Sequence, residues 1–198
     1  MAVLDEGDIA AYIDPYYATY PTTIRSVGAQ ERRIITKAEN YFQPTFNQLD
    51  SSTQKTKSLL INSPNNPTGM VYNKATIQNI CEVAKKNNLW VISDEVYDTQ
   101  IWAGKHISPR EIDNMVERTL VVGSLSKSHA MTGSRLGWLI GPEMIISKAI
   151  DLATNMTYGV PGFVQQAGIF ALEQGKEFEE EISEPFNRRR KIALDILK

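Results

Sequence analysis

The chain has few of the residues that build disulfide frameworks and metal sites. It contains one cysteine, Cys81, and two histidines, His106 and His129. One cysteine excludes an internal disulfide and agrees with a reducing compartment, and so few soft ligands give no reason to expect a metal site. No apolar run approaches the roughly 20 residues of a membrane span, and no signal-peptide pattern opens the chain. The sequence therefore predicts a cytoplasmic protein without a metal or a membrane segment.

An excess of charge of one sign is also lacking. The 198 residues carry a net charge of −2, and 42% of them are hydrophobic and 22% charged. This balance provides no electrostatic attraction to nucleic acid or to a membrane surface, so neither is expected as a partner. The length and the hydrophobic fraction suit one α/β domain with a sizeable core.

Short apolar runs alternate with helical patterns along the chain. Strands are expected over residues 9–13, 32–36, 58–62, 89–93, 119–122 and 136–140. Helices are expected over 16–27, 44–51 and 162–174, after the capping residue Asn73, after Pro142, and from Lys176 onward. Strands that alternate with helices in this way predict a mostly parallel sheet with helices on both faces, which is a three-layer α/β/α fold.

The C-terminal part carries apolar stripes at helical spacing. The helix after Pro142 has one at Ile146, Ala149, Ile150 and Ala153. The helix over 162–174 is expected to bury Phe163, Ala167, Phe170 and Ala171. Pro185 is expected to kink or interrupt the last helix, because proline removes a backbone hydrogen bond.

Polar side chains follow three of the buried strands. Asn66 lies in a rigid loop after the strand over 58–62, Asp94 ends the strand over 89–93, and Lys127 follows the strand over 119–122. Ligands of parallel sheets bind beyond the carboxyl ends of the strands, so these three side chains are expected to face one crevice.

Lys127 lies between two serines in a small-residue loop, where it is either a solvated surface charge or, in a dry cleft, a nucleophile toward carbonyls. A phosphate-binding P-loop is excluded because Ser126, not glycine, precedes Lys127. Ser124 and Lys127 match the Ser-x-x-Lys of penicillin-recognising serine enzymes, but the companion Lys-Thr-Gly is absent, since Met131 precedes Thr132.

An amide, a carboxylate, a lysine, an arginine and an aromatic ring in one crevice meet the needs of pyridoxal phosphate. Its aldehyde needs a lysine amine, and its ring nitrogen needs a carboxylate to stay protonated. Its phosphate needs an arginine and hydroxyls, and its ring face suits an aromatic side chain. The candidates are Asn66, Asp94, Lys127, Arg135 and Tyr17.

Four motifs then resemble one family. They are Asp-Pro-Tyr-Tyr (14–17), Ser-Pro-Asn-Asn-Pro-Thr-Gly (63–69), Ser-Asp-Glu-Val-Tyr (93–97), and Ser-Leu-Ser-Lys (124–127) followed by Arg135. Together they closely resemble the class I/II aminotransferases, the fold-type I pyridoxal-phosphate enzymes related to aspartate aminotransferase. The resemblance covers essentially the whole chain, and the stretch 126–133 is similar to a branch that includes arginine–pyruvate transaminases.

The resemblance implies catalytic roles for Lys127, Asp94 and Tyr97, and a role for Asn66 in binding the cofactor and the substrate. Lys127 resembles the Schiff-base lysine that also moves a proton between the substrate and the cofactor. Asp94 resembles the partner of the ring nitrogen. Asn66 and Tyr97 resemble the donors to the phenolic oxygen, and Asn66 also lies near the substrate carboxylate in that family.

Further residues resemble cofactor ligands. Ser124 and Arg135 resemble the phosphate ligands, and Tyr17 the side chain that stacks on the cofactor ring. The strand over 136–140 resembles the antiparallel strand of the family. Ser134 departs from the large aromatic residue often found before that arginine, which leaves the subgroup open.

The resemblance implies an aminotransferase that transfers an amino group from an amino acid to a 2-oxo acid and forms a homodimer. Members are about twice as long, so residues 1–198 resemble the cofactor-binding large domain cut at both ends, with 176–198 beginning the helix toward a small domain. Such a chain is expected to be weakly active or inactive alone. A non-catalytic truncated fold, a C–S lyase and a related fold-type I enzyme are the alternatives.

Overall fold

Six strands form one sheet in the computed structural model, which describes residues 1–197. The strands are β1 (Ile9–Asp14), β2 (Gln30–Ile35), β3 (Ser58–Asn62), β4 (Trp90–Asp94), β5 (Thr119–Ser124) and β6 (Gly137–Ile140). Their order across the sheet is β2-β1-β3-β4-β5-β6. All neighbours pair in parallel except β5 and β6, which are antiparallel. The predicted mostly parallel sheet and its antiparallel strand are confirmed.

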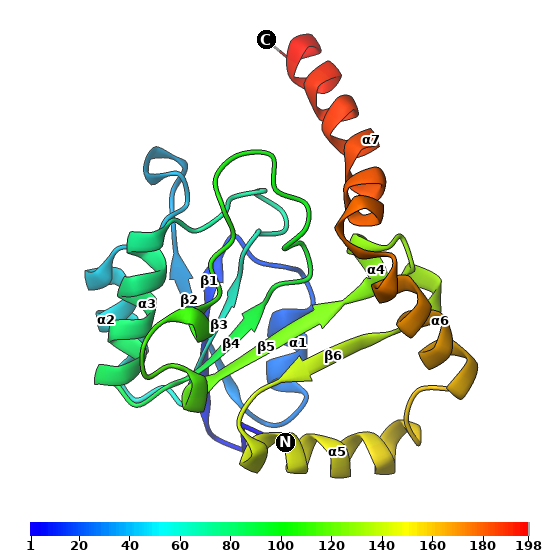
Figure 1. The fold of residues 1–198 in the computed structure, drawn as a ribbon. Helices are drawn as coiled ribbons and strands as arrows, with labels where there is room; N and C mark the ends of the chain where they lie inside the picture. Colours follow the sequence, from blue (N-terminus) through cyan, green and yellow to red (C-terminus); the bar gives the residue numbers. More distant parts are fainter. Residues whose placement is uncertain (198) are drawn as a thin grey trace.

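Helices cover both faces of this sheet, as the sequence predicts. They are α1 (Tyr20–Arg25), α2 (Phe46–Thr53), α3 (Lys74–Lys86), α4 (Leu125–Ser128), α5 (Glu143–Thr157), α6 (Gly162–Glu173) and α7 (Gly175–Ile196). Figure 1 shows α2 and α3 on one side of the sheet and α1 on the other, while α7 projects away from the sheet. The three-layer α/β/α architecture is therefore confirmed.

Alternate side chains of β1 supply the two halves of the core. Ala11 and Ile13 pack into the cluster formed with α2 and α3. Ala10 and Tyr12 point to the other face, where they pack with Ile24 of α1. Because successive strand residues face opposite sides, an inner strand that is apolar from Ile9 to Ile13 fits a sheet covered on both faces.

Helix α3 begins and packs as its sequence predicts. The side chain of Asn73 accepts a hydrogen bond of 2.9 Å from the backbone N–H of Thr76, which caps the helix. Ile77, Ile80 and Cys81 are fully buried on one face. Burial raises the pKa of the Cys81 thiol to about 11, so Cys81 is a packing residue and not a thiolate.

Two helical boundaries differ from the expected ones. Helix α1 begins at Tyr20, and Pro21 occupies its first turn, where the missing N–H is not needed; Tyr16 and Tyr17 lie ahead of it. Lys127 lies in the short helix α4 and not in a loop, because the Ser124 hydroxyl accepts a hydrogen bond of 3.0 Å from the backbone N–H of Ser126 and caps the turn.

Helix α7 continues through Pro185 without interruption, so that part of the prediction is wrong. Proline removes the hydrogen bond to the carbonyl four residues earlier, which belongs to Glu181. Glu181 is exposed, so water can hydrogen-bond that carbonyl.

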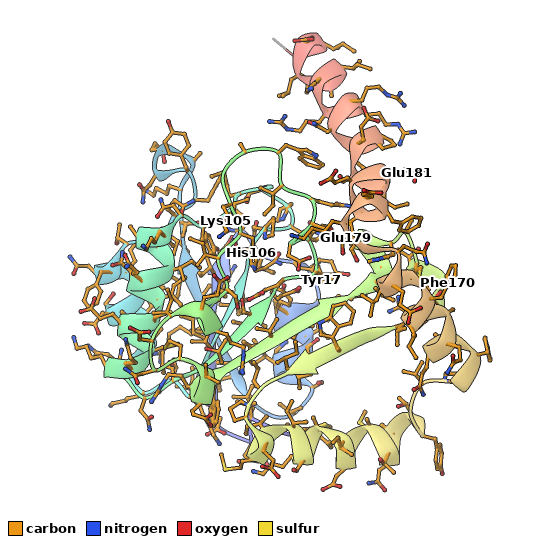
Figure 2. All side chains as sticks on the ribbon, viewed as in Figure 1. Tyr17, Lys105, His106, Phe170, Glu179 and Glu181 are labelled. Atoms are coloured by element: carbon orange, nitrogen blue, oxygen red, sulfur yellow. The ribbon has the colours of Figure 1, made fainter. Side chains whose placement is uncertain are left out.

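The expected burial of α6 is wrong for most of its apolar residues. Phe163 is 78% exposed and Phe170 is 67% exposed, Ala167 is exposed, and only Ala171 of the predicted set is buried. Figure 2 shows Phe170 on the outer side of α6. The stripe on α5 is open as well, with Ile150 59% exposed. A periodic apolar pattern identifies the face that seeks burial, but not what covers it. Within residues 1–197 no helix is both long and apolar enough to cross a membrane.

Candidate active site

A cavity of about 440 Å³ lies at the carboxyl ends of β3, β4 and β5. It brings together all the predicted site residues except Ser124, namely Tyr17, Asn66, Asp94, Tyr97, Lys127 and Arg135. Ser124 lines an adjoining cavity of about 380 Å³, which shares Val122, Ser126 and Arg135 with the first. The expectation that polar side chains after separate strands face one crevice is thus confirmed for Asn66, Asp94 and Lys127.

Asp94 is a half-buried carboxylate at the end of β4. The hydroxyl of Tyr20 donates a hydrogen bond of 2.6 Å to Oδ2, and the backbone N–H of Val96 donates one of 3.3 Å to Oδ1. Burial raises the pKa of Asp94, whereas the hydrogen bonds from Tyr20 and Val96 favour the charged form; the balance lies above the usual value.

Asn62 ties the two neighbouring strand ends together. Its Oδ1 accepts a hydrogen bond of 2.8 Å from the backbone N–H of Asn66, and its Nδ2 donates one of 3.0 Å to the carbonyl of Asp94. The side-chain amide of Asn66 donates a long hydrogen bond of 3.4 Å to the hydroxyl of Tyr97. Sequence reasoning missed Asn62, whose only signal is a buried amide at the end of an apolar strand.

The loop over 63–69 is also held against the segment that carries Tyr17. The side-chain amide of Asn65 donates a hydrogen bond of 3.2 Å to the carbonyl of Pro15. Its Oδ1 accepts hydrogen bonds from the backbone N–H and the hydroxyl of Thr68. These contacts hold Asn66 and Tyr17 on elements that are fixed to each other.

Lys127 projects from α4 into the cavity. Its Nζ lies 5.9 Å from the centre of the Tyr97 ring, and its backbone carbonyl accepts a hydrogen bond of 3.1 Å from the side chain of Gln100. No carboxylate of residues 1–197 lies within ion-pair distance of this ammonium. The amine is therefore not committed to a structural ion pair.

The predicted anion ligands have different surroundings. The Ser124 hydroxyl accepts from the Ser126 N–H and lies 3.0 Å from the carbonyl of Leu136, to which it can donate, so it serves local structure. Arg135 has a left-handed backbone (φ 54°) and donates one hydrogen bond of 2.9 Å to the carbonyl of Thr132. The described chain offers its guanidinium no carboxylate partner. Sequence reasoning missed Ser126 and Thr132, which also line the main cavity.

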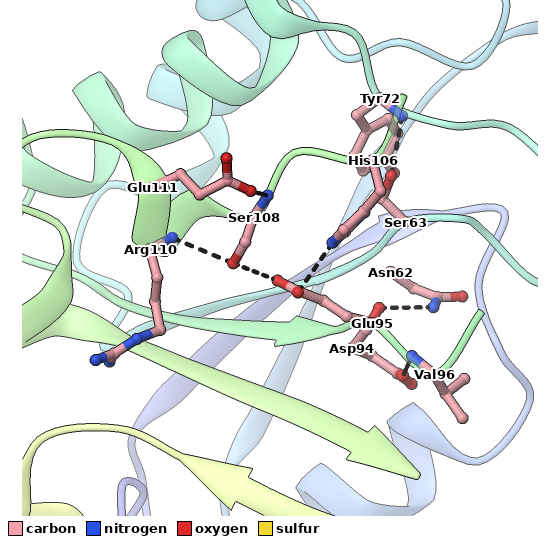
Figure 3. Close-up of polar contacts among 10 residues, drawn as sticks. All are labelled: Asn62, Ser63, Tyr72, Asp94, Glu95, Val96, His106, Ser108, Arg110 and Glu111. Atoms are coloured by element: carbon pink, nitrogen blue, oxygen red, sulfur yellow. Dashed lines mark hydrogen bonds and ion pairs between the residues drawn. The ribbon is translucent and has the colours of Figure 1, made fainter. Parts of the chain in front are cut away.

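A buried cluster of polar side chains around Glu95 follows Asp94 in the chain (Figure 3). One oxygen of Glu95 lies 2.9 Å from Nε2 of His106, and the other accepts a hydrogen bond of 2.7 Å from the Ser108 hydroxyl. Burial raises the pKa of Glu95, but the hydrogen bonds from His106 and Ser108 outweigh it and leave the pKa below its usual value. This answers the requirement that an acid at the end of a buried strand find partners. Residues 1–197 contain no group of three His, Cys, Asp or Glu side chains that could hold a metal ion.

The fold and this cavity define an α/β protein with a lysine, a carboxylate and an arginine at the carboxyl edge of its sheet. The family model described as Aminotransferase class I and II matches residues 1–198, and the chain belongs to this family. The predicted family and fold class are thereby confirmed.

Individual relatives agree with this assignment. The arginine–pyruvate transaminase of Pseudomonas aeruginosa is 36% identical over 196 residues, which cover 98% of this chain and 50% of that protein. The aspartate aminotransferase of Geobacillus stearothermophilus is 34% identical over 198 residues, with the same coverage of each chain. The solved structure of Thermus thermophilus aspartate aminotransferase with maleate has a TM-score of 0.94 at 33% identity, covering 98% of this chain and 51% of that one. The chain spans about half the length of the curated relatives it matches.

Proposed function

We propose that the chain forms the cofactor-binding part of a pyridoxal-phosphate-dependent aminotransferase, which transfers an amino group from an amino acid to a 2-oxo acid. The observation that carries the proposal is the single cavity in which Asp94, Lys127 and Arg135 converge. Neither the Lys127 ammonium nor the Arg135 guanidinium has a carboxylate partner within residues 1–197.

The side chains that line the two cavities offer a partner for each polar group of pyridoxal phosphate. Arg135 belongs to both cavities, so its guanidinium can hold the phosphate together with the hydroxyl of Ser126. Ser124 would join them only by turning its hydroxyl proton from the Leu136 carbonyl toward the phosphate. Asp94 would pair with the protonated ring nitrogen. Asn66 and Tyr97, whose side chains already approach each other, would both donate to the phenolic oxygen. Tyr17 would supply the aromatic wall for the ring.

The cofactor, when bound, supplies an electron sink for the charge left on the substrate's α-carbon. The chain's own residues then have three tasks. Asp94 must remain ionised to hold the ring nitrogen protonated. The Lys127 amine would hold the cofactor's carbonyl carbon as a nucleophile, and the same amine would carry the proton to and from the substrate's α-carbon. The Asn66 amide, at the cavity wall, would orient the substrate carboxylate.

Amino acids and 2-oxo acids are the proposed substrates. A second copy of the chain is the proposed partner, because the apolar side chains of Phe163 and Phe170 on α6 are open to solvent in the single chain and apolar surface of this kind favours association. Residues 176–198 are proposed to begin the connection to a further domain.

An absorbance titration with pyridoxal phosphate tests the proposal. The chain should develop a visible absorption band on binding, and Lys127→Ala should lose it because the amine that reacts is gone. Lys85→Ala is the matched control, since Lys85 is an exposed lysine on α3 with no part in the cavity. The same band in Lys127→Ala as in the unchanged chain, or no band in any form, would refute the proposal.

A further inference from the structure

Tyr20, the first residue of α1, contacts two residues of the candidate site at once. Its hydroxyl donates a hydrogen bond of 2.6 Å to Oδ2 of Asp94. Its ring meets the ring of Tyr17 edge to face, with centroids 5.7 Å apart and an interplanar angle of 76°. The Asp-Pro-Tyr-Tyr motif ends at Tyr17, before Tyr20, and Tyr20 does not line the cavity itself.

We propose that Tyr20 is a positioning residue whose hydroxyl holds Asp94 oriented and ionised, and whose ring supports Tyr17 at the cavity wall. The inference rests on the proposed function, because only a site that needs an ionised Asp94 benefits from this contact. It extends that function to a residue behind the cavity.

The length of the hydrogen bond indicates a strong interaction. Hydroxyl-to-carboxylate bonds of about 2.5–2.7 Å are characteristic of a charged acceptor, and they are roughly twice as strong as neutral ones. The other donor to Asp94, the backbone N–H of Val96, lies 3.3 Å away. Tyr20 is therefore the principal donor that the described chain offers to this carboxylate.

Tyr20 is suited to donate at all ordinary pH values. It is buried, with 9% of its surface exposed. Burial, and then the neighbouring Asp94 carboxylate, raise the pKa of Tyr20 above its usual range. The hydroxyl thus keeps its proton, and the proton faces Asp94.

Asp94 depends on such a donor because its surroundings oppose ionisation. Burial raises the pKa of Asp94, and the charge of Glu95 acts in the same direction, while the hydrogen bond from Tyr20 lowers it. The titratable and charged groups that surround Asp94 on the neighbouring elements are Tyr17, Tyr20, Glu95, Tyr97, Lys127 and Arg135. Among these, Tyr20 alone makes a direct hydrogen bond to the Asp94 carboxylate.

The two contacts of Tyr20 can be separated by substitution. Tyr20→Phe removes the hydroxyl and keeps the ring against Tyr17, whereas Tyr20→Leu removes both. Tyr16→Phe is the matched control, because Tyr16 packs edge to face on Tyr12, 4.8 Å between centroids, and lies outside the cavity.

The experiment follows the titration of Asp94 in the 198-residue chain without cofactor, by NMR of carboxyl-¹³C aspartate, with Asp94→Asn to assign the resonance. Tyr20→Phe should move the Asp94 midpoint to higher pH, and Tyr16→Phe should leave it in place. Loss of a hydrogen bond to a charged group should also weaken binding of added pyridoxal phosphate by about tenfold or more. Tyr20→Leu should weaken it further, because Tyr17 loses its neighbour.

An Asp94 midpoint unchanged by Tyr20→Phe would overturn the proposal, whatever happens to cofactor binding. If Tyr20→Phe fails to fold, the same contact is tested in the unchanged chain. The ¹³Cζ resonance of Tyr20 should then shift with pH at the midpoint of the Asp94 titration. A Tyr20 resonance that does not respond to the ionisation of Asp94 would overturn the proposal. Failure of the unchanged chain to bind pyridoxal phosphate would count against the proposed function instead, and the carboxyl titration separates these two results.

Discussion

Asp94 shows at the residue scale how a functional group costs stability. Its pKa in the folded chain is raised, so between the unfolded and folded values the folded state holds the extra proton. Stability therefore falls as the pH rises through this window, and the loss persists at neutral pH. The fold therefore does not explain a carboxylate at position 94, whereas the proposed function does.

Asp94→Asn is expected to separate stability from function. At pH 7 the cofactor-free variant should be at least as stable as the unchanged chain, because the buried charge is gone and the amide oxygen can still accept from Tyr20. Its interaction with the cofactor should lose about 1.5–3 kcal/mol, the value of a hydrogen bond to a charged group. Urea unfolding between pH 3 and 8 measures the first effect and cofactor titration the second. Destabilisation at pH 7 that disappears in acid would contradict this account.

Several residue contacts of the site could not be predicted from the sequence. Asn66, Asp94 and Lys127 were found because each follows an apolar strand, and parallel strands end at one edge. The roles of Tyr20 and Asn62 were not predicted, because both contact Asp94, which is distant from them in the chain. The Tyr20 hydroxyl donates to the Asp94 carboxylate, and Asn62 bridges Asn66 and Asp94. Propensity and periodicity carry no information on such pairings.

At the scale of elements, the Glu95 cluster fixes the segment between β4 and β5. His106 and Ser108 lie within that segment, and both bind Glu95 at its start. Tyr97 and Gln100 lie on the same segment, and Gln100 also binds the carbonyl of Lys127. The cluster therefore holds a cavity-lining segment in place.

Glu95→Gln should lower the free energy of unfolding by about 1–3 kcal/mol at neutral pH, because a buried charge-assisted contact is lost. The pKa of Glu95 is depressed, so its contribution is present above the unfolded value of about 4.5 and is lost as the pH falls through the folded value. The difference between the two proteins should therefore shrink in acid. Glu82→Gln, at an exposed position of α3, is the control. If the difference in the free energy of unfolding stayed the same down to a pH at which Glu95 is protonated, a role of the charged Glu95 carboxylate would be contradicted.

The close approach of β5 and β6 requires a glycine at position 123. A Cβ atom on Gly123 would lie 2.3 Å from the indole nitrogen of Trp138, too close for any real side chain. Gly123→Ala should therefore destabilise the chain by about 1–3 kcal/mol and disturb the adjoining cavity, which both residues line. Gly133→Ala is the control, because a Cβ there meets nothing within 4 Å and the backbone needs no positive φ. Thermal unfolding compares the two, and equal stability would refute the packing argument.

Secondary structure was predictable where the pattern is strong and local. The strands and α3 follow from apolar runs and from the Asn73 cap. Helix α4 was missed because Ser126, Lys127 and Ser128 have no apolar periodicity, and only the Ser124 cap defines the turn. The exposure of Phe163 and Phe170 was missed because periodicity does not identify a covering partner.

At the scale of the whole molecule, the cavity offers few cations. Lys127 and Arg135 are the lysine and arginine that line it in the described chain, and both have proposed roles toward the cofactor. The substrate carboxylate then has the Asn66 amide but no second guanidinium at the cavity wall. Orientation of reacting groups can contribute about 7–11 kcal/mol to a rate.

The 198-residue chain alone is therefore expected to turn over far more slowly than about 1 per second, even with excess cofactor. A coupled assay for 2-oxo acid formation, with several donor amino acids, measures this rate, and chain lacking Lys127 (Lys127→Ala) supplies the background. Turnover at 1 per second or faster would mean that the described cavity suffices to orient the substrate.

The account depends most on Lys127 as the reactive amine. The direct measurement is to add pyridoxal phosphate, reduce with borohydride, and identify the modified peptide by mass spectrometry. At equimolar cofactor the label should lie on the peptide that contains Lys127, and Lys127→Ala should take up little. A label spread over exposed lysines, and equal in the Lys127→Ala variant, would contradict the account.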